Sequence, residues 1–317
     1  MSRIVSIGAA LQDVYLVDHD DFGTNKRGFF NQIELGSKVD IDKIHFSTGG
    51  GATNAATTFA RMHHESIFMG CIADDDAGHA ILNALDQEGI DSSYVTYTDK
   101  AHTGYSIVML TPTGERTILT CRGASAKFEL LNPDDLDTIY PDWLYVTTFR
   151  GNMDMLDQFF TKAKELGAKI MFNPGNLELQ HTRKFIGLLS DVDVLLVNKE
   201  EAKQIVEGST LKELVYRLKN YVPTVIITDG HQGAIAANGD DVYRIGLYED
   251  IPVKDATGAG DSFGSGFLAA FADGRSFTDS LTFASANSTS VVQYIGSKKG
   301  ILTARARVHS MPIEKVH

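Results

Sequence analysis

The chain has 317 residues, of which 43% are hydrophobic and 22% charged, and this composition is typical of a globular protein with a large buried core. Its formal net charge of −12, without any Lys/Arg cluster, argues against a protein that grips the phosphate backbone of nucleic acid. Two cysteines without metal-ligand spacing, no long apolar run and no signal-peptide pattern predict a cytoplasmic protein without disulfides, structural zinc or a membrane span.

Short apolar runs alternate with longer helical patterns along most of the chain. The strand-like runs are residues 4–7, 143–148, 169–172, 194–197 and 224–228. Apolar residues three and four positions apart predict helices over residues 53–62, 77–88, 153–166, 211–221 and 262–272. This alternation predicts an α/β fold with a mainly parallel sheet, helices on both faces and ligands at the carboxyl ends of the strands.

Two stretches, residues 13–46 and 94–122, break this alternation and have the pattern of strands and turns. They include a hairpin signal at residues 111–114. Because neither stretch contains a helix that could pack on the main sheet, we expect a small β lid inserted into a single α/β domain that spans residues 1–317.

Three consecutive glycines, Gly49, Gly50 and Gly51, come just before the helix expected from residue 53. Glycine permits backbone geometries closed to other residues, and Asn54 offers donors and acceptors to a polyhydroxylated ligand. A plain glycine loop with a capping Asn is the alternative interpretation.

Two polar segments directly follow predicted strands. An amide and a carboxylate, Asn198 and Glu201, come after the strand at 194–197 and could order the water around Mg²⁺, although Glu is also common in a helix's first turn. A hydroxyl and two glycines, Thr228, Gly230 and Gly233, suit a nucleotide, although a turn into a hairpin at residues 234–243 explains them nearly as well.

The most informative segment is DATGAGD at residues 255–261, which leads directly into a predicted helix. Small residues at 258–260 let the backbone approach a ligand, and the free N–H groups of a helix's first turn suit a phosphate. Asp261 adds a negative charge beside this anion site, which indicates a base that takes the proton of an attacking hydroxyl. An Asp that only stabilises the helix N-terminus is the alternative.

In order and spacing these motifs resemble the ribokinase-like (PfkB) family of carbohydrate kinases over essentially the whole chain. The resemblance is carried by Gly49-Gly50 with Asn54, Gly70 to Gly78 followed by Glu88-Gly89-Ile90-Asp91, Gly114-Glu115-Arg116, Asn198 with Glu201, Thr228 with Gly230 and Gly233, and Asp255 to Asp261. It implies a three-layer sandwich with a β lid, and transfer of the γ-phosphoryl group of ATP to a hydroxyl of a sugar or sugar derivative with Mg²⁺.

The resemblance also implies roles for individual residues. Asp261 is the expected base, with the backbone amides of Gly258, Ala259 and Gly260 as the anion hole. The other expected contacts are Asp13, Gly49, Gly50 and Asn54 on the sugar, Asn198 and Glu201 near Mg²⁺, and Thr228, Gly230, Gly233 and Asn287 at the nucleotide. Several relatives bind a monovalent cation such as K⁺ beside the anion hole, and Asp255 and Thr257 match that position.

The acceptor is less defined than the reaction. Arg122 and Arg150 resemble positions that can face the acceptor, and a guanidinium pair would hold a carboxylate or phosphate, as in a sugar acid such as 2-keto-3-deoxygluconate or a sugar phosphate. Two solvated surface arginines are the alternative. A nucleoside kinase of the same family would need an aromatic platform, for which Tyr15, Phe46 and Tyr105 are available.

Other classes fit less well. A dinucleotide-dependent oxidoreductase would need G-x-G-x-x-G after the first strand, where this chain has Gly8-Ala9-Ala10-Leu11-Gln12-Asp13. A non-catalytic sugar sensor would not need Asp261 next to an anion loop. The protruding lid would have an apolar face to cover, so we expect a homodimer formed through the lid.

Overall fold

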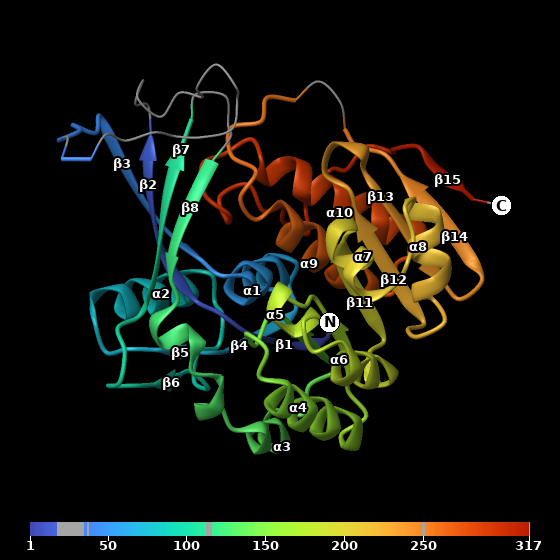
Figure 1. The fold of residues 1–317 in the computed structure, drawn as a ribbon, viewed down its shortest axis with the longest axis horizontal. Helices are drawn as coiled ribbons and strands as arrows, with labels where there is room; N and C mark the ends of the chain where they lie inside the picture. The colour runs from blue at the N-terminus through green and yellow to red at the C-terminus, as the bar shows by residue number, and fades with distance from the viewer. Residues whose placement is uncertain (18–34, 37, 112–115, 249–250, 317) are drawn as a thin grey trace.

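The computed structural model describes residues 1–17, 35–36, 38–111, 116–248 and 251–316, and its main sheet has nine strands (Figure 1). The strands are, in spatial order, β15 (Ile313–Lys315), β14 (Asp241–Ile245), β13 (Ala234–Asn238), β12 (Thr224–Thr228), β11 (Val194–Asn198), β10 (Lys169–Phe172), β9 (Trp143–Val146), β1 (Arg3–Ile7) and β4 (Glu65–Met69). Neighbouring strands from β12 to β4 are parallel, and β13, β14 and β15 are antiparallel. The predicted fold class is therefore confirmed.

Alternating side chains in the strands bury both faces of this sheet. In β9, Trp143 and Tyr145 join the core on one face, whereas Leu144 and Val146 join the core on the other. The first face is covered by α1 (Gly51–Arg61), α9 (Ala259–Ala272) and α10 (Phe277–Val291). The second is covered by α3 (Leu136–Ile139), α4 (Met153–Glu165), α5 (Asn176–Leu179), α6 (Thr182–Leu188), α7 (Lys199–Ile205) and α8 (Leu211–Leu218).

The remaining elements are short or peripheral. The helix α2 (Asp76–Gln87) packs through Ile81 and Leu85 against Phe68 of β4. Short 3₁₀ helices lie at Gly123–Ala126, Phe128–Leu130, Pro133–Asp135, Leu189–Asp191 and Gly230–Gln232. In the part of the chain that the structure describes, no helix is long and apolar enough to cross a bilayer.

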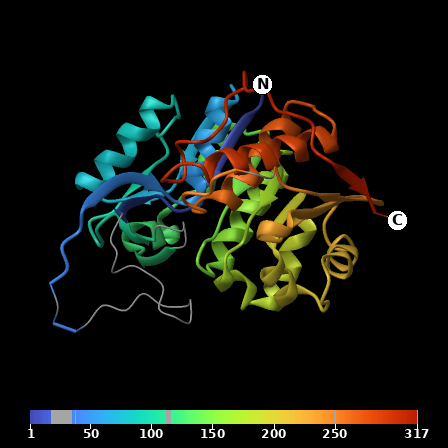
Figure 2. The same ribbon diagram turned by 90° about the horizontal axis from the view of Figure 1, so that it is seen from above.

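A separate four-stranded sheet forms the lid and stands to one side of the main sheet, away from β15 (Figures 1 and 2). Its strands, in spatial order, are β3 (Lys43–Gly49), β2 (Leu11–Val17), β7 (Gly104–Leu110) and β8 (Arg116–Cys121). The expected turn at residues 112–114 and most of the stretch 13–46 lie outside the described residues. A further pair, β5 (Cys71–Ile72) and β6 (Thr96–Tyr97), forms its own sheet, so the lid's second segment starts at Gly104 rather than near residue 94.

The pleat of the lid separates a face turned to the body from an outer face. Asp13 of β2 pairs with Ser47 and Ser106, so these three side chains share one face with Tyr15. Tyr15 is fully buried there and packs with Val108 and Leu110 of the lid and with Ile295 of the body. The lid is thus anchored to the body through the face that carries Asp13.

Candidate active site

The helix α9 begins where the sequence places an anion site. Gly258 caps the helix with φ 78°, and a Cβ on it would lie 2.6 Å from the Cβ of Ser297, so only glycine fits. Within the described residues, the N–H groups of Gly258 and Gly260 donate no hydrogen bond, and that of Ala259 makes a long one of 3.4 Å to Ala256. Free amides at the positive end of a helix are suited to hold a phosphoryl group.

Asp261 lies in the first turn of α9 and is held from the opposite helix. The amide Nδ2 of Asn54 in α1 donates to Asp261 Oδ2 at 2.8 Å, and the Ser297 hydroxyl donates to Asn54 Oδ1 at 2.8 Å. A Cβ on Gly51 would lie 3.1 Å from Asp261 Oδ1, so the glycine leaves space beside the second carboxylate oxygen. Asp261 therefore has one oxygen fixed by an amide and one beside open backbone.

The electrostatic surroundings of Asp261 pull its proton affinity in two directions. Burial raises the pKa of the Asp261 carboxyl, while the hydrogen bond from Asn54 and the charge of Lys298 lower it. A carboxylate with a raised pKa is a stronger base than a solvated one, and the charge of Lys298 opposes the rise that burial causes.

Asp13 and the glycine turn form the neighbouring part of the site. Asp13 is 4% exposed, and Gly49 lies so close that a Cβ on it would be 2.0 Å from Asp13 Oδ2. Gly50 has φ 99° and would place a Cβ 2.2 Å from the carbonyl oxygen of Ala9. Burial raises the pKa of Asp13 to about 6 against the charge of Lys298 and a hydrogen bond with Ser106. This buried carboxylate can accept hydrogen bonds from the hydroxyls of a sugar.

Arg122 lies close enough to Arg150 and to Asp13 for both charges to act on it. Burial lowers the pKa of Arg122, the like charge of Arg150 lowers it further, and Asp13 opposes both effects. Arg122 is half-buried and Arg150 is exposed, with a left-handed backbone at φ 54°. The interpretation of Arg122 as a fully solvated surface residue does not fit this burial.

Glu178 supports the loop that carries Arg150, and the sequence reasoning missed it. Its carboxylate is fully buried and accepts hydrogen bonds from the backbone N–H groups of Phe149 at 2.8 Å, Gly151 at 2.7 Å and Gly175 at 2.7 Å. The Thr148 hydroxyl donates to it as well, at 3.0 Å. The only available signal was a Glu two residues after the turn-forming Gly175-Asn176 pair, which is too common to single out.

Asn198 and Glu201 form a reciprocal cap at the start of α7. The backbone N–H of Glu201 donates to Asn198 Oδ1 at 2.9 Å, and that of Asn198 donates to Glu201 Oε2 at 2.8 Å. Burial raises the pKa of Glu201, and its hydrogen bonds with Asn198 oppose this rise. No cluster of three or more His, Cys, Asp or Glu in the described residues could ligate a metal directly. An amide and a carboxylate at this edge of the sheet suit a Mg²⁺ ion that keeps most of its water.

A cavity of about 590 Å³ lies beside the anion loop on the side of α10. Its lining includes Gly230, Tyr248, Val253, Ala256, Ser288 and Val292. Apolar walls with hydroxyl and backbone groups suit the base and ribose of a nucleotide.

The other expected nucleotide residues have different surroundings. Thr228 pairs directly with Asn198 across β12 and β11, so it lies at the same carboxyl edge. Gly233 is packed so that a Cβ would lie 2.1 Å from the carbonyl oxygen of Ile245. Asn287 is fully buried and uses both ends of its amide, donating to Ser262 O at 2.8 Å and accepting from the Leu302 N–H at 2.8 Å. A nucleotide contact by Asn287 stays a prediction and would require this fully buried amide to become exposed.

The carboxylate of Asp255 is not free to bind a monovalent cation, because Thr257 and Gly296 already donate hydrogen bonds to it. Asp255 is fully buried; its Oδ1 accepts from the backbone and hydroxyl of Thr257 at 2.9 and 2.6 Å, and its Oδ2 accepts from Gly296 N–H at 3.1 Å. The guanidinium of Arg116 in the lid strand β8 lies 3.9 Å from Oδ1. These residues do not fit a K⁺ ion, because the carboxylate already faces a cation of the chain itself.

Comparison with known proteins agrees with this geometry. The model of the pfkB family of carbohydrate kinases matches residues 1–304. The chain is 26% identical over 279 residues to the ribokinase of Haemophilus influenzae, which covers 84% of this chain and 88% of that protein. It is 25% identical over 303 residues to the 5-dehydro-2-deoxygluconokinase of Lacticaseibacillus casei, which covers 86% and 92%.

A solved structure shows the same fold. The Arabidopsis thaliana ribokinase complexed with ribose and ATP superimposes with a TM-score of 0.78 at 22% identity over 96% of both chains. Because the family model spans nearly the whole sequence, the chain belongs to the pfkB family of carbohydrate kinases.

Proposed function

We propose that this carbohydrate kinase transfers the γ-phosphoryl group of ATP to a hydroxyl of a sugar or sugar derivative, with Asp261 as general base. The observation that carries the proposal is the placement of Asp261 in the same helical turn as the free amides of Gly258 and Gly260 and the weakly bonded amide of Ala259. Phosphoryl transfer needs in-line positioning and charge stabilisation more than covalent catalysis, and this arrangement supplies both.

The proposed step follows from these positions. Asp261 takes the proton of the acceptor hydroxyl, the hydroxyl oxygen forms a bond to the γ-phosphorus, and the bond from phosphorus to the β–γ bridging oxygen breaks to release ADP. Asn54 holds Asp261 Oδ2 at 2.8 Å, so that Oδ1 beside Gly51 is the oxygen that receives the proton. Asn198 and Glu201 would hold Mg²⁺, which would neutralise charge on the nucleotide phosphates.

The two arginines favour an acidic acceptor as the finer assignment. Arg122 and Arg150 lie close enough for their charges to oppose each other, and Asp13 lies beside them. An acceptor with a carboxylate for the arginines and hydroxyls for Asp13, such as 2-keto-3-deoxygluconate, complements this set. The similarity to a 5-dehydro-2-deoxygluconokinase supports a sugar-acid or keto-sugar acceptor in the same way.

A nucleoside acceptor is the second candidate and is less favoured. Tyr15 is buried under the lid, whereas Phe46 and Tyr105 pair with Val14 and Gln12 and therefore lie on the opposite face of the sheet. The three aromatic side chains do not form one platform for a base. Nucleoside kinase activity would therefore need a different stacking partner.

A product screen tests the proposal directly. The enzyme is incubated with MgATP and a panel of sugars, sugar acids, sugar phosphates and nucleosides, and products are identified by mass. We expect one acceptor class to gain a phosphoryl group, with kcat/KM highest for an acidic sugar. Release of phosphate from ATP without any phosphorylated acceptor would contradict the assignment.

The substitution Asp261→Asn tests the base. We expect kcat to fall by at least about 10²-fold, because an amide cannot accept the hydroxyl proton, with the melting temperature and ATP affinity nearly unchanged. Steady-state kinetics, thermal unfolding and calorimetric ATP binding measure these quantities. The exposed Asp86→Asn is the matched control and should keep full activity. Near-normal turnover by the Asp261 variant would remove the mechanism.

A further inference from the structure

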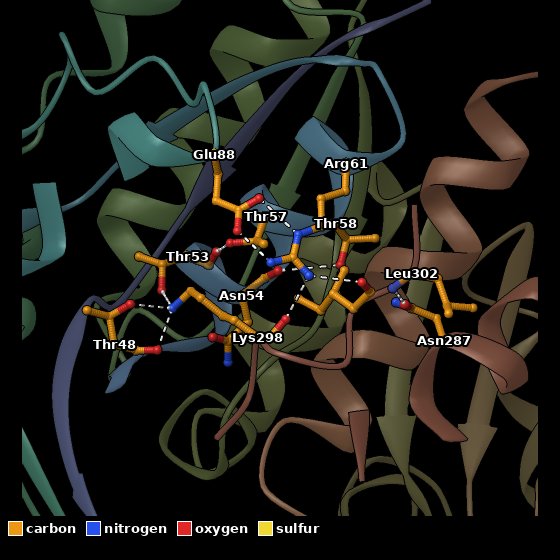
Figure 3. A network of polar contacts seen from close by, with 11 residues as sticks. Thr48, Thr53, Asn54, Thr57, Thr58, Arg61, Glu88, Asn287, Lys298 and Leu302 are labelled. Atoms are coloured by element: carbon orange, nitrogen blue, oxygen red, sulfur yellow. Dashed lines mark hydrogen bonds and ion pairs between the residues drawn. The ribbon is translucent and has the colours of Figure 1, made fainter. Parts of the chain in front are cut away.

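The segment at residues 296–298, after α10, touches three parts of the candidate site. The Gly296 N–H donates to Asp255 Oδ2, the Ser297 hydroxyl donates to Asn54 Oδ1, and the Ser297 Cβ lies against Gly258. Ser297 and Lys298 contact Asn54 and Thr53, respectively, in the first turn of α1 (Figure 3). Residues distant in sequence therefore hold Asn54, which in turn holds the carboxylate of Asp261.

Lys298 ends this segment and binds the glycine turn that leads into α1. Its ammonium Nζ donates to the carbonyl oxygen of Thr48 at 2.6 Å, the hydroxyl of Thr48 at 3.1 Å and the hydroxyl of Thr53 at 2.9 Å (Figure 3). An ammonium has three protons, and these three acceptors satisfy all of them. Lys298 thereby ties together the two ends of the turn that contains Gly49, Gly50 and Gly51.

The guanidinium of Arg61 fixes the backbone of Lys298. The guanidinium of Arg61 in α1 donates to the carbonyl oxygens of Lys298 and Ile301, each at 2.9 Å, and pairs with Glu88 at 2.9 Å (Figure 3). The positive charge of Lys298 is thus held at one place by side-chain and backbone contacts together.

We propose that Lys298 is a positioning residue for phosphoryl transfer: its ammonium clamps the glycine turn between Thr48 and Thr53 and places a positive charge near the carboxylates of Asp13 and Asp261. The proposal rests on the role of Asp261 as base. The charge of Lys298 lowers the pKa of both carboxyls, against the burial that raises them. Burial lowers the pKa of Lys298 itself to about 8, opposed by Asp13, Asp261 and Glu88 and assisted by Arg61.

The variant Lys298→Met removes the charge and keeps an unbranched side chain. Asp261 must lose its proton to act, so activity rises as pH passes upward through its pKa. Without Lys298 that pKa increases, and we expect the acidic limb of kcat/KM against pH to move upward by about one unit. Lys299→Met is the matched control, because Lys299 is exposed and lies 5.6 Å from the ring centre of Tyr294.

The variant Lys298→Arg keeps the positive charge at a pH where the lysine has lost a proton that the glycine turn needs. Above its pKa of about 8, Lys298 keeps two protons for three acceptors, so wild-type activity should fall there. A guanidinium stays charged at that pH. We therefore expect Lys298→Arg to keep the wild-type acidic limb and to shift the alkaline limb upward. This comparison holds even where Lys298→Met does not fold.

A titration without turnover keeps the two proposals distinguishable. Carbon-13 NMR of the Asp carboxyls in the enzyme without substrate should show two groups whose pKa values rise in Lys298→Met and not in Lys299→Met. If Asp261→Asn were active, the proposal that Asp261 is the base would fail, but the effect of Lys298 on the carboxyl titrations would still stand. Identical carboxyl titrations and identical acidic limbs in the wild type and Lys298→Met would overturn the role of Lys298, as would a change confined to the melting temperature.

Discussion

At the scale of single residues, Glu178 accounts for the backbone of the loop after β9. Arg150 and Gly151 both have left-handed backbones, with φ of 54° and 80°, and this conformation is uncommon for a residue with a side chain. The Glu178 carboxylate accepts hydrogen bonds from Phe149 and Gly151 on either side of Arg150. It thereby holds Arg150 near Arg122 despite the strain.

Replacing Glu178 with Gln should weaken both the fold and acceptor binding. The new NH₂ group would face N–H or O–H donors, so we expect the free energy of unfolding to fall by about 2 kcal/mol. The KM for the acceptor should rise severalfold, while the KM for ATP stays the same. Denaturant unfolding and steady-state kinetics measure the two effects. Glu165→Gln, an exposed change in α4, is the control, and equal values for both variants would contradict this role.

Residues whose partners lie nearby in the chain are predictable, and those with distant partners are not. Asp261 is recognisable because the glycines that define its anion loop precede it directly. The contact of Ser297 with Asn54 spans 243 positions, and that of Lys298 with Thr53 spans 245, so no local pattern marks either residue. The local motifs are enough to predict the family from the sequence. The residues that hold the site in place, Ser297 and Lys298, can be identified only from the three-dimensional structure.

At the scale of elements, the predicted strands and helices are found to within a few residues, and the missed ones lack a clear apolar period. The helix α10 has the sequence FTDSLTFASANSTSV, rich in small polar residues that pack closely against α9 but give little contrast between its two faces. The edge strands β4 and β15 are only five and three residues long, and such short segments give too little periodicity to be recognised. Tertiary packing decides these elements, and a single sequence does not reveal it.

The strand β8 brings a cation to the segment before α9. Arg116 lies 3.9 Å from Asp255 Oδ1, and its buried Nε has no hydrogen-bond partner in the part of the chain that the structure describes. A guanidinium and a monovalent cation repel each other at such distances in a weakly polar interior. The lid therefore supplies the charge that balances Asp255.

We expect turnover to be independent of potassium. Initial rates in potassium chloride and in choline chloride at the same ionic strength should agree within about two-fold, because Arg116 already neutralises Asp255. Arg116→Ala should lower the rate and create a response to potassium, since the carboxylate would then lack a counter-charge. Strong activation of the wild-type enzyme by potassium would show that Arg116 moves away from Asp255 during turnover.

At the scale of the whole molecule, the outer face of the lid is apolar and exposed. Ile44, Phe46 and Leu119 are 55%, 66% and 55% exposed, and the strand pairing places them on one face with Tyr105 and Ile107. A contiguous apolar patch of this kind is usually covered by a partner surface. A second copy of the lid offers a matching surface, so we propose that the protein dimerises through this face.

Sedimentation velocity tests this assembly. We expect the wild type to sediment as a dimer at micromolar concentration and Phe46→Glu as a monomer, because a carboxylate buried at the interface costs more than the contact gains. Tyr221→Glu, a change of another exposed aromatic residue, between α8 and β12, should remain dimeric. A wild-type monomer throughout the concentration range would exclude a dimer through the lid.

The contact between Asn54 and Ser297 also sets the order in which the enzyme can mature. Translation proceeds from the N-terminus, so the ribosome exposes β1, the lid strands and α1 long before it makes residues 296–298. Until those residues emerge, Asn54 lacks the Ser297 hydroxyl, the glycine turn lacks the Lys298 ammonium and Gly258 lacks the Ser297 side chain beside it. The candidate site is therefore completed only when almost the whole chain has been synthesised.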